Sequence, residues 1–287
     1  MNAHIGYLAI VSDQPEKLAR FYAQYFQMWE LGRSDEGDIS ITDGHLNVSL
    51  LKQRPGVEGA CGRPGLSHFG VSIDGIREVE ARLEEFAPNA EIQPENGDLH
   101  HGEYRVFDPN GIAVSLSTTN FGIEGQPARR LPRIRHVTYS VGKGDEVLGY
   151  FVNVFGFREL SLSKTRRQQQ HPARFAGDGH INLAILPSMA PGAVDTEKFP
   201  GWQYVERYRD EDERAINERW GLNHFGFVVG DVEALMNSMP PELSRMTNKR
   251  PEIRNMAEYR VFDPDLNAID LSQLKGYEVD VDVWERA

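Results

Sequence analysis

The chain has 287 residues, of which 40% are hydrophobic and 26% charged, and its formal net charge is −12 at pH 7. This is the balance of a globular protein long enough for one large domain or two ordinary ones. The negative charge disfavours nucleic acid and anionic membranes as partners, and no apolar run has the length that crosses a bilayer. Cys61 is the only cysteine and the first residues do not resemble a signal peptide, so we expect a cytoplasmic protein without disulfides.

The first 118 residues contain the same order of elements twice. The run IGYLAIVS predicts a strand, and in PEKLARFYAQYF the apolar residues recur at three- and four-residue steps, as in an amphipathic helix. Short β-rich runs with an Asp-Gly turn complete a unit at 4–55. The strand HFGVSI, the helix IREVEARLEEF and further short strands form a second unit at 65–118.

The remaining residues repeat these two units. HIGYLAIVSD (4–13) aligns with HVTYSVGKGD (136–145), which places His4 opposite His136. DGHLNVSLL (43–51) matches DGHINLAIL (178–186), and GLSHFGVSI (65–73) matches GLNHFGFVV (221–229). The heptapeptide EYRVFDP stands at 103–109 and again at 258–264. Such ordered matches indicate a tandem duplication, with third and fourth units at 134–187 and 221–274.

The duplication predicts two domains. We expect an N-terminal domain at 1–120, a linker rich in Gly, Pro and Arg at 121–133, and a C-terminal domain at 134–287. The spacing between the halves grows by about 21 residues between the DGHLNVSLL match and the GLSHFGVSI match, so the C-terminal domain carries an insertion near 187–220. That insertion would serve either as a lid or as an oligomer contact.

This order of motifs resembles the vicinal oxygen chelate superfamily, which contains the glyoxalases, the bleomycin-resistance proteins and the extradiol dioxygenases. The resemblance rests on the strand histidines and on the closing turn D-P-x-x-x-A-x-[DS]-L-S, and it covers 4–118 and 134–274. It implies an α+β fold of four βαβββ units in two tandem domains, each an incomplete mixed β-barrel with flanking helices. Whether units one and two pair, or one and four, stays open.

In that family, metal ligands point into the barrel from its first and last strands. The resemblance implies His136, His224 and Asp270 as ligands, with His4 as the alternative third ligand if the first unit packs against the fourth. Two imidazoles and one carboxylate form the facial set that binds non-haem Fe(II), with Mn(II) or another divalent metal as the alternative. The first half offers Ser115 in place of the carboxylate, so we expect no metal there.

Two further residues are candidates for catalysis. By resemblance, His180 moves protons during the reaction, although a histidine just after an Asp-Gly turn could equally be a solvated surface residue. Arg260 stands ten residues before Asp270, where dioxygenases usually carry a tyrosine, and would bind a substrate anion or pair with a structural acid. Asn182 stands where glyoxalase-type relatives place a second carboxylate, which argues against proton abstraction by a carboxylate at that position.

The favoured function is therefore extradiol-type ring cleavage of a catechol-like aromatic with O₂, in a protein that forms a homo-oligomer. One alternative is a metal-dependent lyase or isomerase of the glyoxalase type that acts through an enediolate on an oxygenated substrate. The other is a non-catalytic protein that binds or sequesters a small molecule, as the bleomycin-resistance proteins do.

Overall fold

A computed structural model describes residues 2–55, 64–95, 102–127, 131–160, 173–187, 221–240, 243, 248–249 and 257–273. Most of the expected insertion near 187–220 lies outside these ranges, as does Cys61. None of the described helices is long and apolar enough to cross a bilayer.

The first half contains two βαβββ units. Unit one comprises β1 (His4–Ser12), α1 (Pro15–Phe26), β2 (Trp29–Arg33), β3 (Ile39–Thr42) and β4 (Asn47–Lys52). Unit two comprises β5 (Gly65–Ser72), α2 (Ile76–Phe86), β6 (Gln93–Pro94), β7 (Tyr104–Phe107) and β8 (Ala113–Ser117). A short 3₁₀ helix, η1 (Asn120–Gly122), follows.

The second half repeats this succession. Unit three comprises β9 (Arg133–Val141), α3 (Gly144–Phe155), β10 (Arg158–Glu159), β11 (Arg174–Gly177) and β12 (Asn182–Pro187). Unit four comprises β13 (Gly221–Val228), α6 (Val232–Ser238), β14 (Asn248–Lys249), β15 (Tyr259–Phe262) and β16 (Ala268–Ser272). The expected α+β fold with four such units is confirmed.

Helices α1 and α3 begin differently but end by the same means. Pro15 stands at the start of α1, where its missing N–H costs nothing. The chain leaves each helix through a left-handed residue, Gln27 (φ 54°) after α1 and Gly156 (φ 73°) after α3. This conformation lets the amide after the last turn bond back to a helix carbonyl, which stops the helix and turns the chain into the next strand.

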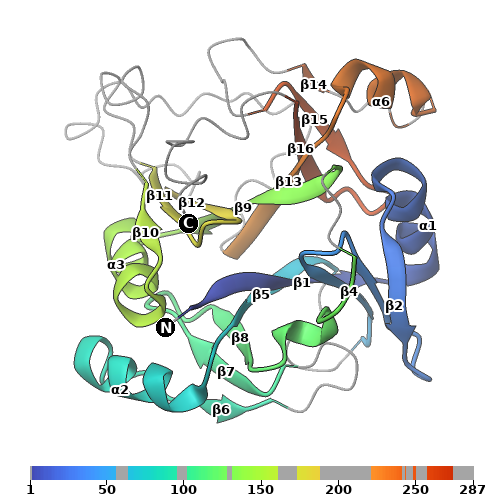
Figure 1. The fold of residues 1–287 in the computed structure, drawn as a ribbon. Helices are drawn as coiled ribbons and strands as arrows, with labels where there is room; N and C mark the ends of the chain where they lie inside the picture. The colour runs from blue at the N-terminus through green and yellow to red at the C-terminus, as the bar shows by residue number, and fades with distance from the viewer. Residues whose placement is uncertain are drawn as a thin grey trace, which may run out of the picture.

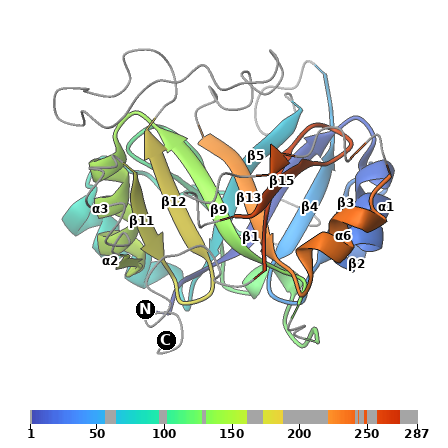
Figure 2. The same ribbon diagram turned by 90° about the horizontal axis from the view of Figure 1, so that it is seen from above.

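The strand order settles how the units pair. One sheet runs β2-β3-β4-β1-β5-β8-β7-β6, and the other runs β10-β11-β12-β9-β13-β16-β15-β14. In each sheet the first strands of two consecutive units are antiparallel neighbours, β1 with β5 and β9 with β13. Units one and two therefore share one sheet, and units three and four share the other, so His4 and His224 lie in different sheets (Figures 1 and 2).

Each sheet has two faces with different partners. Leu8 and Ile10 of β1, like Val137 and Tyr139 of β9, belong to one hydrophobic core that both halves share. The alternate residues point the opposite way. We call this second side the site face; it carries Tyr7, Ala9 and Val11 in β1, and His136, Thr138 and Ser140 in β9.

The strand register corrects one alignment made from sequence. Tyr7 pairs with Asn47 and Gly70, and His136 pairs with Asn182 and Gly226. The position of His136 in the second sheet is therefore occupied by Tyr7 in the first. Likewise His4 opposes Ser72 as Arg133 opposes Val228. The alignment of His4 with His136 was wrong. The amino-acid similarity between the two strands is greatest when they are shifted by three residues from the alignment that the structure gives.

The aspartates of the repeated motifs join the two halves. In the Asp-Gly-His turns, Asp43 accepts a hydrogen bond from Ile134 N (2.7 Å), and Asp178 accepts one from Ile5 N (2.6 Å). Each aspartate also accepts amide bonds from its own turn, for example from Leu46 N to Asp43. The amide at the same strand position in each half thus donates to the turn aspartate of the other half.

The EYRVFDP aspartates form a second pair of such links. Asp108 accepts from Tyr139 Oη (2.8 Å) and Asp263 from Tyr22 Oη (2.7 Å), each across the boundary between halves. Burial raises the pKa of Asp263 to about 6. The shared heptapeptide is therefore a turn whose aspartate also bonds to the other half.

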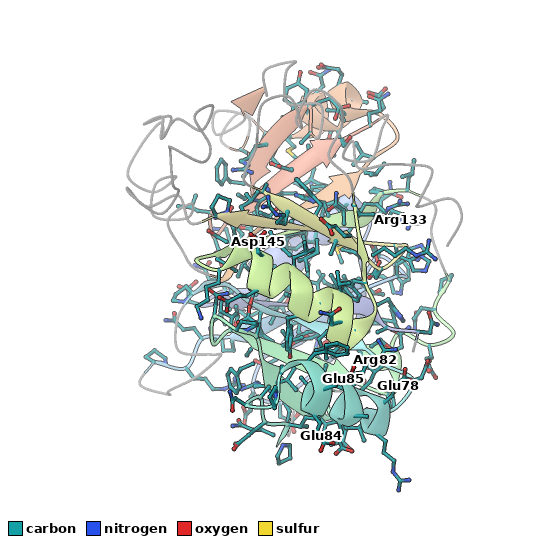
Figure 3. The ribbon with its side chains drawn as sticks, turned by 90° about the vertical axis from the view of Figure 1, so that its left-hand side faces the viewer. Glu78, Arg82, Glu84, Glu85, Arg133 and Asp145 are labelled. Atoms are coloured by element: carbon teal, nitrogen blue, oxygen red, sulfur yellow. The ribbon has the colours of Figure 1, made fainter. Side chains whose placement is uncertain are left out.

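The helices pack across the same boundary. Phe26 of α1 stacks on Phe227 of β13 with ring centroids 4.1 Å apart. Helix α2 lies beside α3, as Figure 3 shows from that side. Arg82 Nη1 of α2 donates to Asn153 O of α3 (3.3 Å). Helices α1 and α6 lie at the opposite side of the molecule (Figure 2). Because these contacts cross from one half to the other, the two halves pack as one body.

Candidate metal centre

Three buried side chains converge on the site face of the second sheet. His136 on β9, His224 on β13 and Asp270 on β16 are 3%, 6% and 7% exposed. Each offers one donor atom, and these atoms all lie within 4.8 Å of one another. They come together because β9, β13 and β16 are sheet neighbours and Gly226, between His136 and Asp270 in register, has no side chain to separate them.

The hydroxyl of Thr138 lies between the two imidazoles. Its Oγ1 is 2.6 Å from His136 Nε2 and 2.9 Å from His224 Nε2. Asn223 Oδ1 lies 2.6 Å from His224 Nδ1, which orients that ring with Nε2 toward the cluster. Sequence reasoning missed Thr138, although its place two residues after His136 on one strand face was the signal.

Arg260 binds the carboxylate of the cluster. Its Nε donates to Asp270 Oδ1 (2.7 Å), and Asp270 Oδ2 lies 3.3 Å from His224 Nε2. Arg260 is 4% exposed, so both charges of this pair are removed from water. The pairing arises from the antiparallel register of β15 and β16, in which Arg260 opposes Asp270.

This donor set fits a divalent transition metal. Two imidazole nitrogens and one carboxylate oxygen, presented from one side, are the facial set of non-haem Fe(II) and also suit Mn(II). The Thr138 hydroxyl can donate to one Nε2 atom and accept from the other, so it holds both nitrogens toward the same point.

Apolar side chains border the donor atoms on the same face. Phe175, Ala184, Thr138 and His224 are successive partners across β11, β12, β9 and β13. Phe175 belongs to a small cluster with Leu160, Ala173, Ala184 and Ala257. The centre therefore has an apolar side next to its polar donors.

His180 and His4 lie outside the three-residue group. His180 is an exposed residue of the turn between β11 and β12, and its ring centroid is 6.3 Å from that of His4. His4 Nε2 lies 2.9 Å from Asn120 Oδ1. Desolvation lowers the pKa of His180; the charge of Asp178 opposes this effect, and the smaller contributions of His4, Arg133 and His45 add to it, so the imidazole is neutral at neutral pH.

The corresponding region of the first sheet is filled by an aromatic ring. Tyr7 lies against His68 with ring centroids 5.6 Å apart, much as His136 lies 5.5 Å from His224. Phe121 stacks on Tyr7 at 4.9 Å, and a Cβ added to Gly70 would come within 2.5 Å of its ring. Phe121 therefore occupies the space beside Ser115, and the first residues of the expected linker belong to the packed interior of the first half.

Comparisons with known proteins agree with this architecture. Residues 4–116 match the Glyoxalase/Bleomycin resistance protein/Dioxygenase superfamily. No curated protein sequence matches the chain significantly.

Three similar solved structures are enzymes by name. The Mn(II)-bound glyoxalase from Novosphingobium aromaticivorans is 14% identical, with a TM-score of 0.61 over 97% of this chain and 83% of its own. The 2,3-dioxygenase LapB from Pseudomonas sp. KL28 is 14% identical, with a TM-score of 0.60 over 97% and 93%. Homoprotocatechuate 2,3-dioxygenase from Arthrobacter globiformis is 15% identical, with a TM-score of 0.60 over 94% and 79%.

At such low identity these structures establish the fold alone, and the reaction has to be argued from the site. Residues 4–116 are therefore similar to the Glyoxalase/Bleomycin resistance protein/Dioxygenase superfamily, and over nearly its whole length the chain shares the fold of these dioxygenases and this glyoxalase.

Proposed function

We propose that this protein is a metal-dependent enzyme that cleaves a catechol-like aromatic with O₂ by extradiol-type chemistry. The observation that carries the proposal is the convergence of His136, His224 and Asp270, with donor atoms within 4.8 Å of one another in a buried position. We assign these three residues as the ligands of one divalent metal, Fe(II) in preference to Mn(II). When bound, Fe(II) supplies the redox chemistry that ring cleavage by O₂ requires.

The surrounding residues have separate tasks in this proposal. Asn223 fixes the ring of His224 through Nδ1, and Arg260 holds the carboxylate of Asp270 through Oδ1. The positive charge of Arg260 also favours an anionic substrate close to Asp270. The apolar side of the centre, which includes Phe175, suits an aromatic ring.

We keep His180 as the candidate acid/base. Its lowered pKa leaves the imidazole neutral and able to accept a proton at neutral pH. Replacement of His180 by alanine should lower kcat while the metal content stays unchanged. His45→Ala, in the matching turn of the first half, should change neither. An unchanged kcat in His180→Ala would remove His180 from the reaction.

The experiment that tests the function is anaerobic reconstitution with Fe(II), followed by metal analysis and addition of catechol or 2,3-dihydroxybiphenyl with O₂. We expect one metal per chain, O₂ uptake and a yellow ring-opened product. His224→Ala should lose metal and activity together, whereas His68→Ala, its counterpart in the first sheet, should keep both. Metal retention by His224→Ala would refute the assigned centre.

A second candidate is a lyase or isomerase of the glyoxalase type. The similarity to a Mn(II)-bound glyoxalase favours it. Against it, the residue beside His136 on β12 is Asn182, and an amide cannot take a proton from substrate as a carboxylate does. Stoichiometric metal without O₂ uptake would favour this candidate, and absence of metal after reconstitution would favour a binding protein without catalysis. A cytoplasmic location and a homo-oligomeric state remain predictions from sequence.

A further inference from the structure

The side chain of Asn182 is buried and has no hydrogen-bond partner among the described residues. Asn182 is 0% exposed, and neither its amide oxygen nor its amide nitrogen has a partner within the described part of the chain. A buried polar group left in this state costs about 1–3 kcal/mol, so proteins seldom keep one without a use for it. The position of the amide indicates what that use is.

Asn182 faces the candidate metal centre. It is the parallel partner of His136, and paired residues of neighbouring strands point to the same face of a sheet. The same register line continues through Gly226 to Asp270 and Arg260. The amide therefore stands at one end of a row of polar side chains whose other end is the guanidinium of Arg260.

In the first half, the asparagine at the same position makes its hydrogen bonds within the protein. Asn47 occupies the same place beside Tyr7 and is also 0% exposed. Its Nδ2 donates to Phe121 O (2.8 Å), and its Oδ1 accepts from the hydroxyl of Ser49 (3.2 Å). In the second half the residue two places after the asparagine is Ala184, which has no hydroxyl.

We propose that Asn182 is a substrate-binding residue whose amide recognises a singly ionised vicinal diol on an aromatic ring. An ionised oxygen accepts from Nδ2, while the neighbouring hydroxyl donates to Oδ1, so one amide satisfies both oxygens of the monoanion. A metal ion bound directly to Oδ1 would leave both hydrogens of Nδ2 without an acceptor. Because an amide does not titrate, Asn182 positions and selects the substrate and takes no part in proton transfer. This inference rests on the proposed function.

The test compares Asn182→Leu with Asn47→Leu, since leucine has nearly the shape of asparagine without its polar atoms. Asn182→Leu should keep or raise the melting temperature, because it removes a group that the protein leaves unsatisfied. Asn47→Leu should lower the melting temperature by about 2–6 °C, because the substitution leaves the hydrogen-bond partners of Asn47 unsatisfied. A similar loss of stability in Asn182→Leu would show that the protein itself satisfies this amide, and would overturn the proposal.

Ligand binding supplies the second measurement. Fe(II)-loaded protein is titrated under argon with 4-nitrocatechol, whose visible absorption reports ionisation of its hydroxyls. We expect the Kd of Asn182→Leu to rise about 10- to 100-fold, as for the loss of hydrogen bonds to a charged group, while Asn47→Leu binds like the unmodified protein. The Fe(II) affinity of both variants should be unchanged.

The remaining outcomes separate the two proposals. Equal 4-nitrocatechol affinity in Asn182→Leu and the unmodified protein would overturn the role of Asn182 and leave the proposed function standing. A fall in Fe(II) affinity in Asn182→Leu would make Asn182 a metal ligand and also overturn its role as a diol-binding residue. Failure of the unmodified, Fe(II)-loaded protein to bind 4-nitrocatechol would overturn both.

Discussion

The two halves of this molecule share a strand order, a register and several buried residues, yet they treat the same site face differently. In the first half that face holds Tyr7, Asn47 and Ser115, and Phe121 packs over Gly70 to close it. In the second half the corresponding positions are His136, Asn182 and Asp270, and three donor atoms converge there. A duplicated scaffold thus keeps its backbone while a few side chains decide whether a position becomes hydrophobic interior or a polar centre.

The arginine of the repeated heptapeptide makes the same point. Arg105 and Arg260 oppose Ser115 and Asp270 in identical register. Arg105 forms an ion pair with Glu95, whereas Arg260 bonds to Asp270 within the donor group. The arginine is common to both halves, and its function follows from which carboxylate lies within reach.

The largest effect is expected from changing the carboxylate in one half and its counterpart in the other. Asp270→Asn should abolish stoichiometric metal binding, since loss of a direct ligand should exceed the roughly 10- to 100-fold cost of losing a residue that only supports one. The amide can still accept from Arg260, so the fold should persist. Ser115→Ala should leave the metal content unchanged. Metal analysis after Fe(II) addition measures both. Equal metal occupancy in Asp270→Asn, Ser115→Ala and the unmodified protein would contradict the assignment of the metal site to the second half.

The next largest effect concerns the ring that closes the first half. Phe121→Ala should lower the free energy of unfolding by about 3–5 kcal/mol, because it removes a fully buried ring and leaves a cavity beside Gly70 and Tyr7. Its metal content should not change. Phe86 on α2 is 49% exposed, so Phe86→Ala serves as the control and should cost little. Urea unfolding measures both, and equal costs would show that Phe121 does not close the first half.

The bonds between the halves come next. Tyr139→Phe should lower the free energy of unfolding by about 1.5–3 kcal/mol, because Asp108 loses a donor from the other half. Tyr150 is a suitable control, since it is 5% exposed and its hydroxyl has no partner among the described residues. Tyr150→Phe should therefore be neutral or stabilising. The opposite ranking in thermal unfolding would mean that Tyr139 does not join the halves through its hydroxyl.

The smallest effect is a dependence of stability on pH. The pKa of Asp263 is raised to about 6 from an ordinary 3.8, so the folded state binds the proton more tightly than the unfolded state. Protonation therefore stabilises the fold, and the contribution of Asp263 to the free energy of unfolding should rise by roughly 1 kcal/mol from pH 7 to pH 5. Asp263→Asn should lose this part of the pH dependence. Urea unfolding at the two pH values measures it, and an unchanged slope in the variant would contradict the raised pKa.

The sequence by itself determined the four βαβββ units and their α+β fold, which follow from local periodicity and from a repeat whose order is preserved. The group of His136, His224 and Asp270 was implied by the resemblance of these motifs to a known superfamily. Only the tertiary structure decided the rest. The match of His4 with His136 failed because strand register depends on the hydrogen bonds of β1 to β4 and β5. Amino-acid similarity along a single strand does not report these bonds. Three features depend on contacts between distant segments or neighbouring strands: the packing of Phe121 over Gly70, the hydroxyl of Thr138 between two imidazoles, and the amide of Asn182, which has no partner among the described residues. Burial and hydrogen bonding are set by what surrounds a side chain in space, so the sequence alone does not report them.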